Sequence, residues 1–331
     1  MSENSLGVPS VDAALEGRLR ARMLDVEKEL AAATQSEAPF VTEAARHLLE
    51  AGGKRFRPLL VLLSAEFGDR DAPGVVPSAL VVELTHVATL YHDDVMDEAS
   101  LRRGAPSANA RWDNTVAILV GDYLFSRASD IVADLGPEAV RLQARTFSRL
   151  VHGQIRETLG PTDGQDELAH YLSVVADKTG SLIATSALFG ALMAQAPERV
   201  QVALTQFGER IGSCFQLADD IIDVVSDTGD LGKASGTDLR EGVPTLPALL
   251  ARASDDPTDA RLRELLGRPL TDDAEHREAL ELLRAHRAVD EARAYVQRRA
   301  DNARALLAPL PDIPARHALE ALCDLVVTRS G

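Results

Sequence analysis

Apolar residues recur at helical spacing along almost the whole chain, and this periodicity is the feature that most limits its fold. Leu15, Leu19, Met23, Val26 and Leu30 follow one another at intervals of four, four, three and four residues, which places them on one face of a helix. We find no segment with the alternation of apolar and polar residues that marks a half-buried strand. An all-α fold is therefore expected, and the aromatic content of only 4% agrees with it.

Several of the predicted helices are apolar on more than one side, which is typical of helices in the central layer of a helical domain. The predicted ranges are Ser78–His92, Thr115–Leu135, Pro137–Leu159, Leu168–Ala194, Val200–Val225, Ala274–Ala308 with one interruption, and Pro314–Thr328. Ser10 is the predicted N-cap of the first helix. Breaks rich in glycine or proline fall at 52–53, 69–77, 104–106, 160–164 and 227–247. We expect residues 1–9 to be a flexible N-terminus and residues 10–331 to form one helical domain.

The charge balance limits the classes of function, and residues 1–9, which contain neither a basic cluster nor an apolar core, are not expected to be a secretory signal. The chain has 35 Lys and Arg against 51 Asp and Glu, a net charge of −16, which argues against nonspecific binding to nucleic acid or to an anionic membrane. Thr179–Pro197 carries no charge, but its many small and polar residues favour a buried helix over a transmembrane segment. We expect a cytoplasmic protein in which Cys214 and Cys323 are reduced and buried.

Two clusters of aspartates stand out because each lies in an otherwise apolar helix. The first comprises Asp93, Asp94 and Asp97, and the second repeats its spacing with Asp219, Asp220 and Asp223. Residues four apart share a helix face, so each cluster can present a pair of carboxylates to a hard cation. Clusters with only oxygen ligands favour Mg²⁺ or Mn²⁺ over Zn²⁺. Bound metal ions or a cationic partner would offset the repulsion between these like charges.

Basic residues accompany the two clusters. Lys54, Arg55 and Arg57 follow the Gly52–Gly53 turn, Arg102 and Arg103 follow the first cluster, Lys178 begins the uncharged helix, and Lys233 follows the second cluster. Any one of them is by default a surface cation. Together with metal-binding carboxylates, they are suited to holding phosphate groups.

In their order along the chain, these motifs resemble those of the trans-isoprenyl diphosphate synthases, the polyprenyl synthetase family. The resemblance runs from about residue 40 to 330. It is carried by GGKRFRP at 52–58, HDDVMD with RRG at 92–104, GDYL at 121–124, Lys178–Thr179, FQLADDIID at 215–223, Gly232–Lys233, GTDLREG at 236–242 and TLP at 245–247. It implies a fold of the isoprenoid synthase type, a bundle of long antiparallel helices around a central cavity.

The resemblance also implies a chemistry, the Mg²⁺-dependent head-to-tail condensation of an allylic diphosphate with isopentenyl diphosphate to give an all-trans polyprenyl diphosphate. The expected metal ligands are Asp93 and Asp97 on one side and Asp219 and Asp223 on the other, with Asp94 and Asp220 supporting them. Three Mg²⁺ ions are expected, with Mn²⁺ as an alternative. Arg102, Lys178 and Lys233 would stabilise the departing diphosphate, and the residues expected to bind isopentenyl diphosphate are Lys54, Arg57, His86 and Arg103. Thr179 and Gln216 would orient the reacting carbons, and a homodimer is expected.

Product length depends, in this family, on the residues four and five positions before the first aspartate. These are Thr89 and Ala88, which the resemblance places along the tunnel that receives the growing chain. Their small size favours a product longer than geranylgeranyl, unless Tyr91, Tyr123 or Phe125 closes this tunnel. A short-chain farnesyl or geranylgeranyl diphosphate synthase is the main alternative. A class I terpene cyclase and a noncatalytic partner subunit are further ones, and both complete aspartate clusters argue against them.

Overall fold

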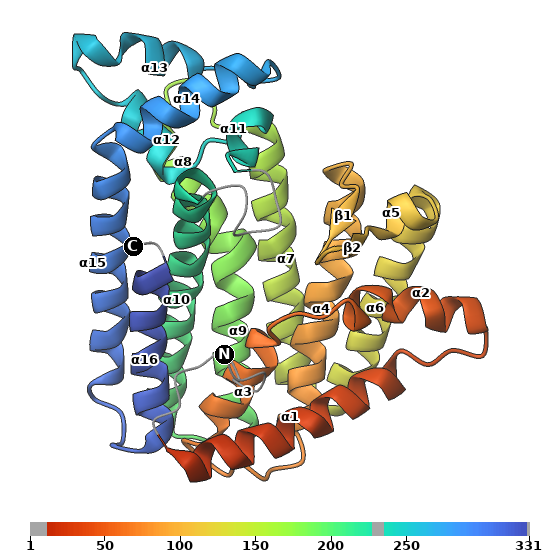
Figure 1. Ribbon diagram of the computed structural model, residues 1–331. Coiled ribbons are helices and arrows are strands. Elements are labelled where there is room, and N and C mark those ends of the chain that lie inside the picture. The colour runs from red at the N-terminus through yellow and green to blue at the C-terminus, as the bar shows by residue number, and fades with distance from the viewer. Residues whose placement is uncertain (1–11, 227–234, 330–331) are drawn as a thin grey trace. The chain divides into compact units, whose positions relative to one another are not determined.

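The computed structural model describes residues 12–226 and 235–329, which form helices and one minimal β-hairpin (Figure 1). These residues divide into two compact units. The first comprises described residues of 12–148, 182–208 and 309–321, and the second those of 149–181, 209–308 and 322–329. The all-α prediction is confirmed, whereas the expectation of a single domain stays a prediction. The predicted flexible segment 1–9 lies outside the described residues.

The first unit is built around the long helix α4. Its elements are α1 (Ala13–Ala33), α2 (Pro39–Glu50), α3 (Phe56–Ala65), α4 (Val75–Met96), β1 (Leu101–Arg102), β2 (Ala105–Pro106), α5 (Ala108–Arg111), α6 (Asn114–Asp134) and nearly all of α9 (Ser181–Met193). Helices α4 and α6 pack along each other (Figure 1). At Gly121 of α6 the absence of a side chain makes room for the His92 ring, whose Nε2 lies 3.2 Å from the Ile118 carbonyl oxygen.

The second unit contains several short helices and one helix of 20 residues. They are α8 (Glu167–Val175), a π-helical turn (Ala176–Gly180), α11 (Thr237–Glu241), α12 (Leu246–Arg252), a 3₁₀ turn (Pro257–Asp259), α13 (Ala260–Leu265), α14 (Asp273–Ala285) and α15 (Ala288–Leu307). Three further helices contribute residues to both units, namely α7 (Pro137–Leu159), α10 (Glu198–Val225) and α16 (Pro314–Arg329). Both cysteines are buried, as expected.

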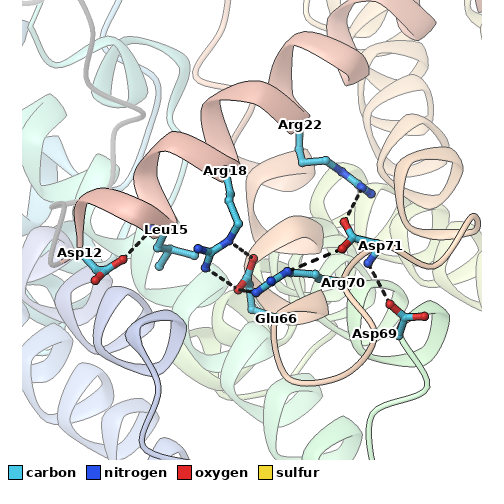
Figure 2. Close-up of polar contacts among 8 residues, drawn as sticks. All are labelled: Asp12, Leu15, Arg18, Arg22, Glu66, Asp69, Arg70 and Asp71. Carbon is cyan, nitrogen blue, oxygen red and sulfur yellow. Dashed lines mark hydrogen bonds and ion pairs between the residues drawn. The ribbon is translucent and has the colours of Figure 1, made fainter.

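Helix α1 begins differently from the prediction. Its N-cap is Asp12, whose side chain accepts a hydrogen bond from the Leu15 backbone N–H at 2.6 Å, so the prediction of Ser10 is wrong. An aspartate is as good a cap as a serine and lies closer to the apolar stripe. Four of the five predicted stripe residues are buried, Met23 being the exception. Beside this stripe, Arg18 Nη2 pairs with Glu66 Oε2 at 3.0 Å and Arg22 Nη1 with Asp71 Oδ1 at 3.3 Å, and both partners follow the end of α3 (Figure 2).

Three other segments differ from the sequence interpretation. Strands β1 and β2 pair antiparallel across a turn at Arg103 and Gly104, both with positive φ, and two-residue strands are too short to show alternation. The single helix expected over 168–194 is interrupted by the π-helical turn. Within the break expected at 227–247, the described part contains α11. Among the described residues, no helix combines the length and the apolarity needed to cross a bilayer.

Candidate active site

The first aspartate cluster lies at the C-terminal end of α4. Asp97 caps the helix and its backbone N–H donates to the Asp93 carbonyl oxygen at 2.8 Å. Asp93 is half-buried and Asp97 is exposed, so both carboxylates can reach solvent. The C-terminal end of a helix carries partial negative charge, which makes it an unfavourable place for anions and a favourable one for a cation between them. This end of α4 therefore attracts a cation more strongly than a solvated acidic surface would.

Asp94 has a different environment, because it points into the first unit. Its side chain is 0% exposed and accepts a hydrogen bond from Arg102 Nε at 2.6 Å. A buried carboxylate needs such a partner, since an unpaired one would cost several kcal/mol. The pair joins the β-hairpin to α4. The pair holds Arg102 beside the first cluster, and the supporting role expected for Asp94 stays a prediction.

The second cluster lies near the C-terminal end of α10, in the second unit. Asp219 is exposed and forms an ion pair with Arg329, Nη2 to Oδ1, at 2.8 Å. The guanidinium carbon of Arg329 also lies 5.8 Å from the centre of the Phe215 ring. The two oxygens of Asp223 accept the backbone N–H groups of Thr237 and Asp238 at 3.3 and 3.2 Å, at the start of α11. A cation bound at Asp219 would share this carboxylate with Arg329 or displace it, because the ion pair engages only the Oδ1 atom.

Asp220 is the buried member of the second cluster. One of its oxygens accepts a hydrogen bond from the Tyr171 hydroxyl, and the other accepts one from Gln216 Nε2 at 3.0 Å. Burial raises its pKa to about 6, the neighbouring Asp219 and Asp223 contribute to the rise, and the two hydrogen bonds oppose it. The Asp220 carboxylate, like that of Asp94, is buried and accepts hydrogen bonds from protein side chains, so it does not face solvent.

A basic cluster fills the region between α3, α4 and the hairpin of the first unit. The pKa of His86 is lowered well below its usual value by burial and by the positive charges of Arg57 and Arg103, with smaller contributions from Arg102 and Arg55. Burial likewise lowers the pKa of Arg57 to about 10. Arg57 Nε is buried with no hydrogen-bond partner among the described residues. Such a set of cations around a neutral histidine is suited to an anion that supplies the missing acceptors.

The Gly52–Gly53 turn interlocks with Arg103. Gly53 has φ of +137°, and a Cβ atom there would lie 2.9 Å from the Arg103 guanidinium carbon. The guanidinium group donates to the carbonyl oxygens of Leu48, at 2.7 Å, and Gly52. Lys54, next in the chain, is exposed. The turn therefore fixes Arg103 from one side and leaves Lys54 accessible to a ligand.

Arg55 is a residue to which the sequence interpretation gave no specific function. It adopts a left-handed conformation with φ of 44° and pairs with Glu27 at 2.6 Å and Glu83 at 3.0 Å. A third bond goes to the Leu49 carbonyl oxygen at 2.8 Å. Arg55 therefore anchors the turn to α1, α2 and α4. The sequence shows three basic residues at 54, 55 and 57, but nothing in it distinguishes Arg55 as the one that anchors the turn.

The π-helical turn in the second unit presents Lys178 and Thr179. Lys178 Nζ lies 2.5 Å from Glu157 Oε2, and Thr179 Oγ1 donates to Gln216 Oε1 at 3.2 Å. At Gly153 of α7, a Cβ atom would lie 2.8 Å from the Lys178 backbone nitrogen, so the absence of a side chain allows the close approach. π-Helical turns are rare and occur often at functional sites. The only sequence signal for it was the charged pair at 177–178 in an apolar segment.

The remaining predicted residues are found as follows. Ala88 is 2% exposed, and Thr89 is half-buried with its hydroxyl donating to the His86 carbonyl oxygen at 2.7 Å. The Tyr91 hydroxyl is bound to backbone groups of Leu48 and Ala44, so it braces α2 against α4. Lys233 lies outside the described residues.

Neither cluster makes a complete metal site by itself. In the part of the chain that the structure describes, no three His, Cys, Asp or Glu side chains are arranged to hold a metal ion. Mg²⁺ in proteins is commonly held by one or two carboxylates together with water and substrate phosphates. Two accessible carboxylates at a helix C-terminus fit a metal ion of that kind, one that binds together with a phosphorylated substrate.

The helical fold, the paired carboxylates and the largely half-buried basic cluster together suit an enzyme that binds phosphorylated substrates. The family model "Polyprenyl synthetase" matches residues 38–283. A nonaprenyl diphosphate synthase of Mycobacterium tuberculosis is 49% identical over 326 residues, which cover 98% of this chain and 97% of the relative. Component 2 of the heptaprenyl diphosphate synthase of Geobacillus stearothermophilus is 41% identical over 300 residues, 90% of this chain and 92% of the relative.

The solved structures agree with these relatives. The geranylgeranyl pyrophosphate synthase of Corynebacterium glutamicum, in complex with calcium and isoprenyl diphosphate, aligns with a TM-score of 0.88 and 45% identity over 98% of this chain and all of that one. The chain belongs to the polyprenyl synthetase family and is a prenyltransferase. The family resemblance inferred from the motifs is thereby confirmed.

Proposed function

We propose that this prenyltransferase uses Mg²⁺ to condense an allylic diphosphate with isopentenyl diphosphate and that it makes a product longer than geranylgeranyl. The observation that carries the proposed length is the pair of small residues on α4, Ala88 and Thr89, just before Asp93. The nonaprenyl and heptaprenyl relatives support a long product, and the geranylgeranyl relative represents the shorter alternative. A homodimer and a cytoplasmic location stay predictions.

The proposed reaction begins when the allylic carbon–oxygen bond breaks and a diphosphate departs. Metal ions, when bound, neutralise the charge that develops on this diphosphate. We assign Asp93 and Asp97 to one metal-binding side and Asp219 and Asp223 to the other. Arg102, Lys178 and Lys233 are the proposed protein cations for the departing diphosphate. Cations that are already in place stabilise such a leaving group without reorganisation.

Isopentenyl diphosphate is proposed to bind at the basic cluster, through Lys54, Arg57, His86 and Arg103. Thr179 and Gln216 orient the reacting carbons, whose cationic intermediate is protected from water by apolar helices. The released diphosphate accepts the final proton, since the described residues offer no convincing base. Each condensation thus forms one carbon–carbon bond and releases one diphosphate and one proton.

Replacing Arg57 with Ala is expected to raise the KM for isopentenyl diphosphate about tenfold or more, because one charge-assisted hydrogen bond to a phosphate is lost. The KM for the allylic substrate should change little. Steady-state kinetics with each substrate varied in turn checks this, with Arg70→Ala as the control, since Arg70 is an exposed arginine paired with Glu66. A rise in the allylic KM alone would show that the basic cluster binds the other substrate.

A further inference from the structure

A chain of hydrogen bonds connects three elements of the second unit. It begins at the Tyr171 hydroxyl on α8, which donates to Asp220 on α10. The other oxygen of Asp220 accepts from Gln216, one helical turn earlier, at 3.0 Å. The Gln216 amide oxygen accepts from the Thr179 hydroxyl, in the π-helical turn, at 3.2 Å. Tyr171 and Asp220 are 8% and 5% exposed, so this end of the chain is shielded from water.

The chain fixes which way the Gln216 amide faces. An ionised carboxylate can only accept hydrogen bonds, so the amide nitrogen of Gln216 must point toward Asp220. The amide oxygen is thereby turned toward Thr179. Without Asp220 held in place, the amide could rotate and exchange its two ends. Gln216 is one of the two residues to which we assign the orientation of the reacting carbons.

We propose that Tyr171 is a positioning residue of this prenyltransferase, which acts on catalysis by holding Asp220 and through it the orientation of Gln216. The inference rests on the function proposed above. It adds a residue that none of the sequence motifs contained. Tyr171 lies on the helix that leads into the π-helical turn, so it also connects that turn to the interior of its unit.

The chemistry of the interior supports a positioning function rather than simple packing. A buried carboxylate costs several kcal/mol unless its oxygens are hydrogen-bonded, and an apolar residue of the same size would fill this space without that cost. The two side-chain donors to Asp220 come from two different helices. Burying this carboxylate therefore costs more free energy than packing alone requires. Its consequence is that the Asp220 carboxylate and the Gln216 amide are held in fixed orientations.

Replacing Tyr171 with Phe removes only the hydroxyl oxygen. We expect kcat to fall about tenfold, the size of effect that the loss of one hydrogen bond to a charged group produces, whereas the KM for isopentenyl diphosphate should stay within about twofold. Tyr295→Phe is the matched control, because its hydroxyl accepts from Arg299 at 3.0 Å elsewhere in the same unit. All variants are assayed well below their own thermal unfolding midpoints. Asp220→Asn addresses the same contact from the other side and should also lower kcat.

A double-mutant cycle separates positioning from general structural support. If Tyr171 acts through Gln216, Tyr171→Phe should have less than about a twofold effect on kcat in a Gln216→Ala background. A Tyr171→Phe variant with the wild-type kcat would overturn the inference, and so would an effect of equal size in both backgrounds. The turnover of the wild type separates a failure of the proposed function from a failure of this inference. An inactive wild-type chain refutes the proposed function, whereas an active wild type with an unaffected Tyr171→Phe variant refutes only the positioning by Tyr171.

Discussion

Replacing Asp93 with Ala is expected to lower kcat by a factor of about one hundred or more while leaving the protein folded. Asp93 is half-buried at the C-terminal end of α4, where the helix dipole opposes a carboxylate and favours the cation that it binds. Removing one preorganised electrostatic contact to a developing charge commonly costs that much in kcat. Asp219→Ala should have a similar effect. The measurement is turnover at saturating Mg²⁺ and saturating substrates.

The control for this prediction is Asp130→Asn, a change at an exposed aspartate of α6 that pairs with Arg127 at 3.2 Å. Its turnover should match that of the wild type. A second readout does not depend on turnover: Mg²⁺ with inorganic diphosphate should raise the unfolding temperature of the wild type and raise that of Asp93→Ala much less, since a ligand stabilises the state to which it binds. Unaltered turnover of both Asp93→Ala and Asp219→Ala would refute the metal assignment.

The second large effect is expected on the length of the product. Ala88 is almost fully buried on α4, five residues before Asp93, so Ala88→Phe would place a large ring in the proposed path of the growing chain. We expect the main product to shorten by several isoprene units, and Ala88→Val and Ala88→Leu to give intermediate lengths. Chromatography of the dephosphorylated products measures this.

Overpacking is a competing cause of reduced activity, because added volume in a tight interior costs about 1–3 kcal/mol of stability. Thermal unfolding of the three variants identifies it. Consumption of the first isopentenyl diphosphate should continue in Ala88→Phe, since the reacting end lies nearer the aspartates. An unchanged distribution of products in a folded Ala88→Phe variant would show that Ala88 does not line the path of the chain.

Much of the helical architecture could be predicted from the sequence, because helix periodicity is a local property. Helices α6, α7 and α10 begin and end within about two residues of the ranges expected from their apolar residues. The π-helical turn could not be predicted in this way. It depends on the close approach of Gly153 and on contacts of Thr179 with Gln216, which come from other helices.

In the candidate site, too, the local motifs could be predicted from the sequence, whereas the contacts of their side chains could not. The aspartate clusters and the basic residues are visible as motifs, but a motif does not show which members face solvent. Asp94 and Asp220 follow their neighbours by one residue, a rotation of about 100° on a helix, and so point inward. The partner of Asp94, Arg102, is eight residues away across a turn that the motif does not reveal. Tyr171, which binds Asp220, and Arg329, which pairs with Asp219, come from distant parts of the chain.

The most direct test of the proposed function is a product analysis of the purified chain. The protein, with no other protein present, is incubated with Mg²⁺, labelled isopentenyl diphosphate and one allylic primer. The primers are, in turn, dimethylallyl, geranyl, farnesyl and geranylgeranyl diphosphate. Label should enter a linear product longer than geranylgeranyl, and removing Mg²⁺ with a chelator should abolish its formation. Termination at geranylgeranyl or shorter would contradict the assigned length. No incorporation with any primer would contradict the assignment of this chain as an enzyme that acts on its own.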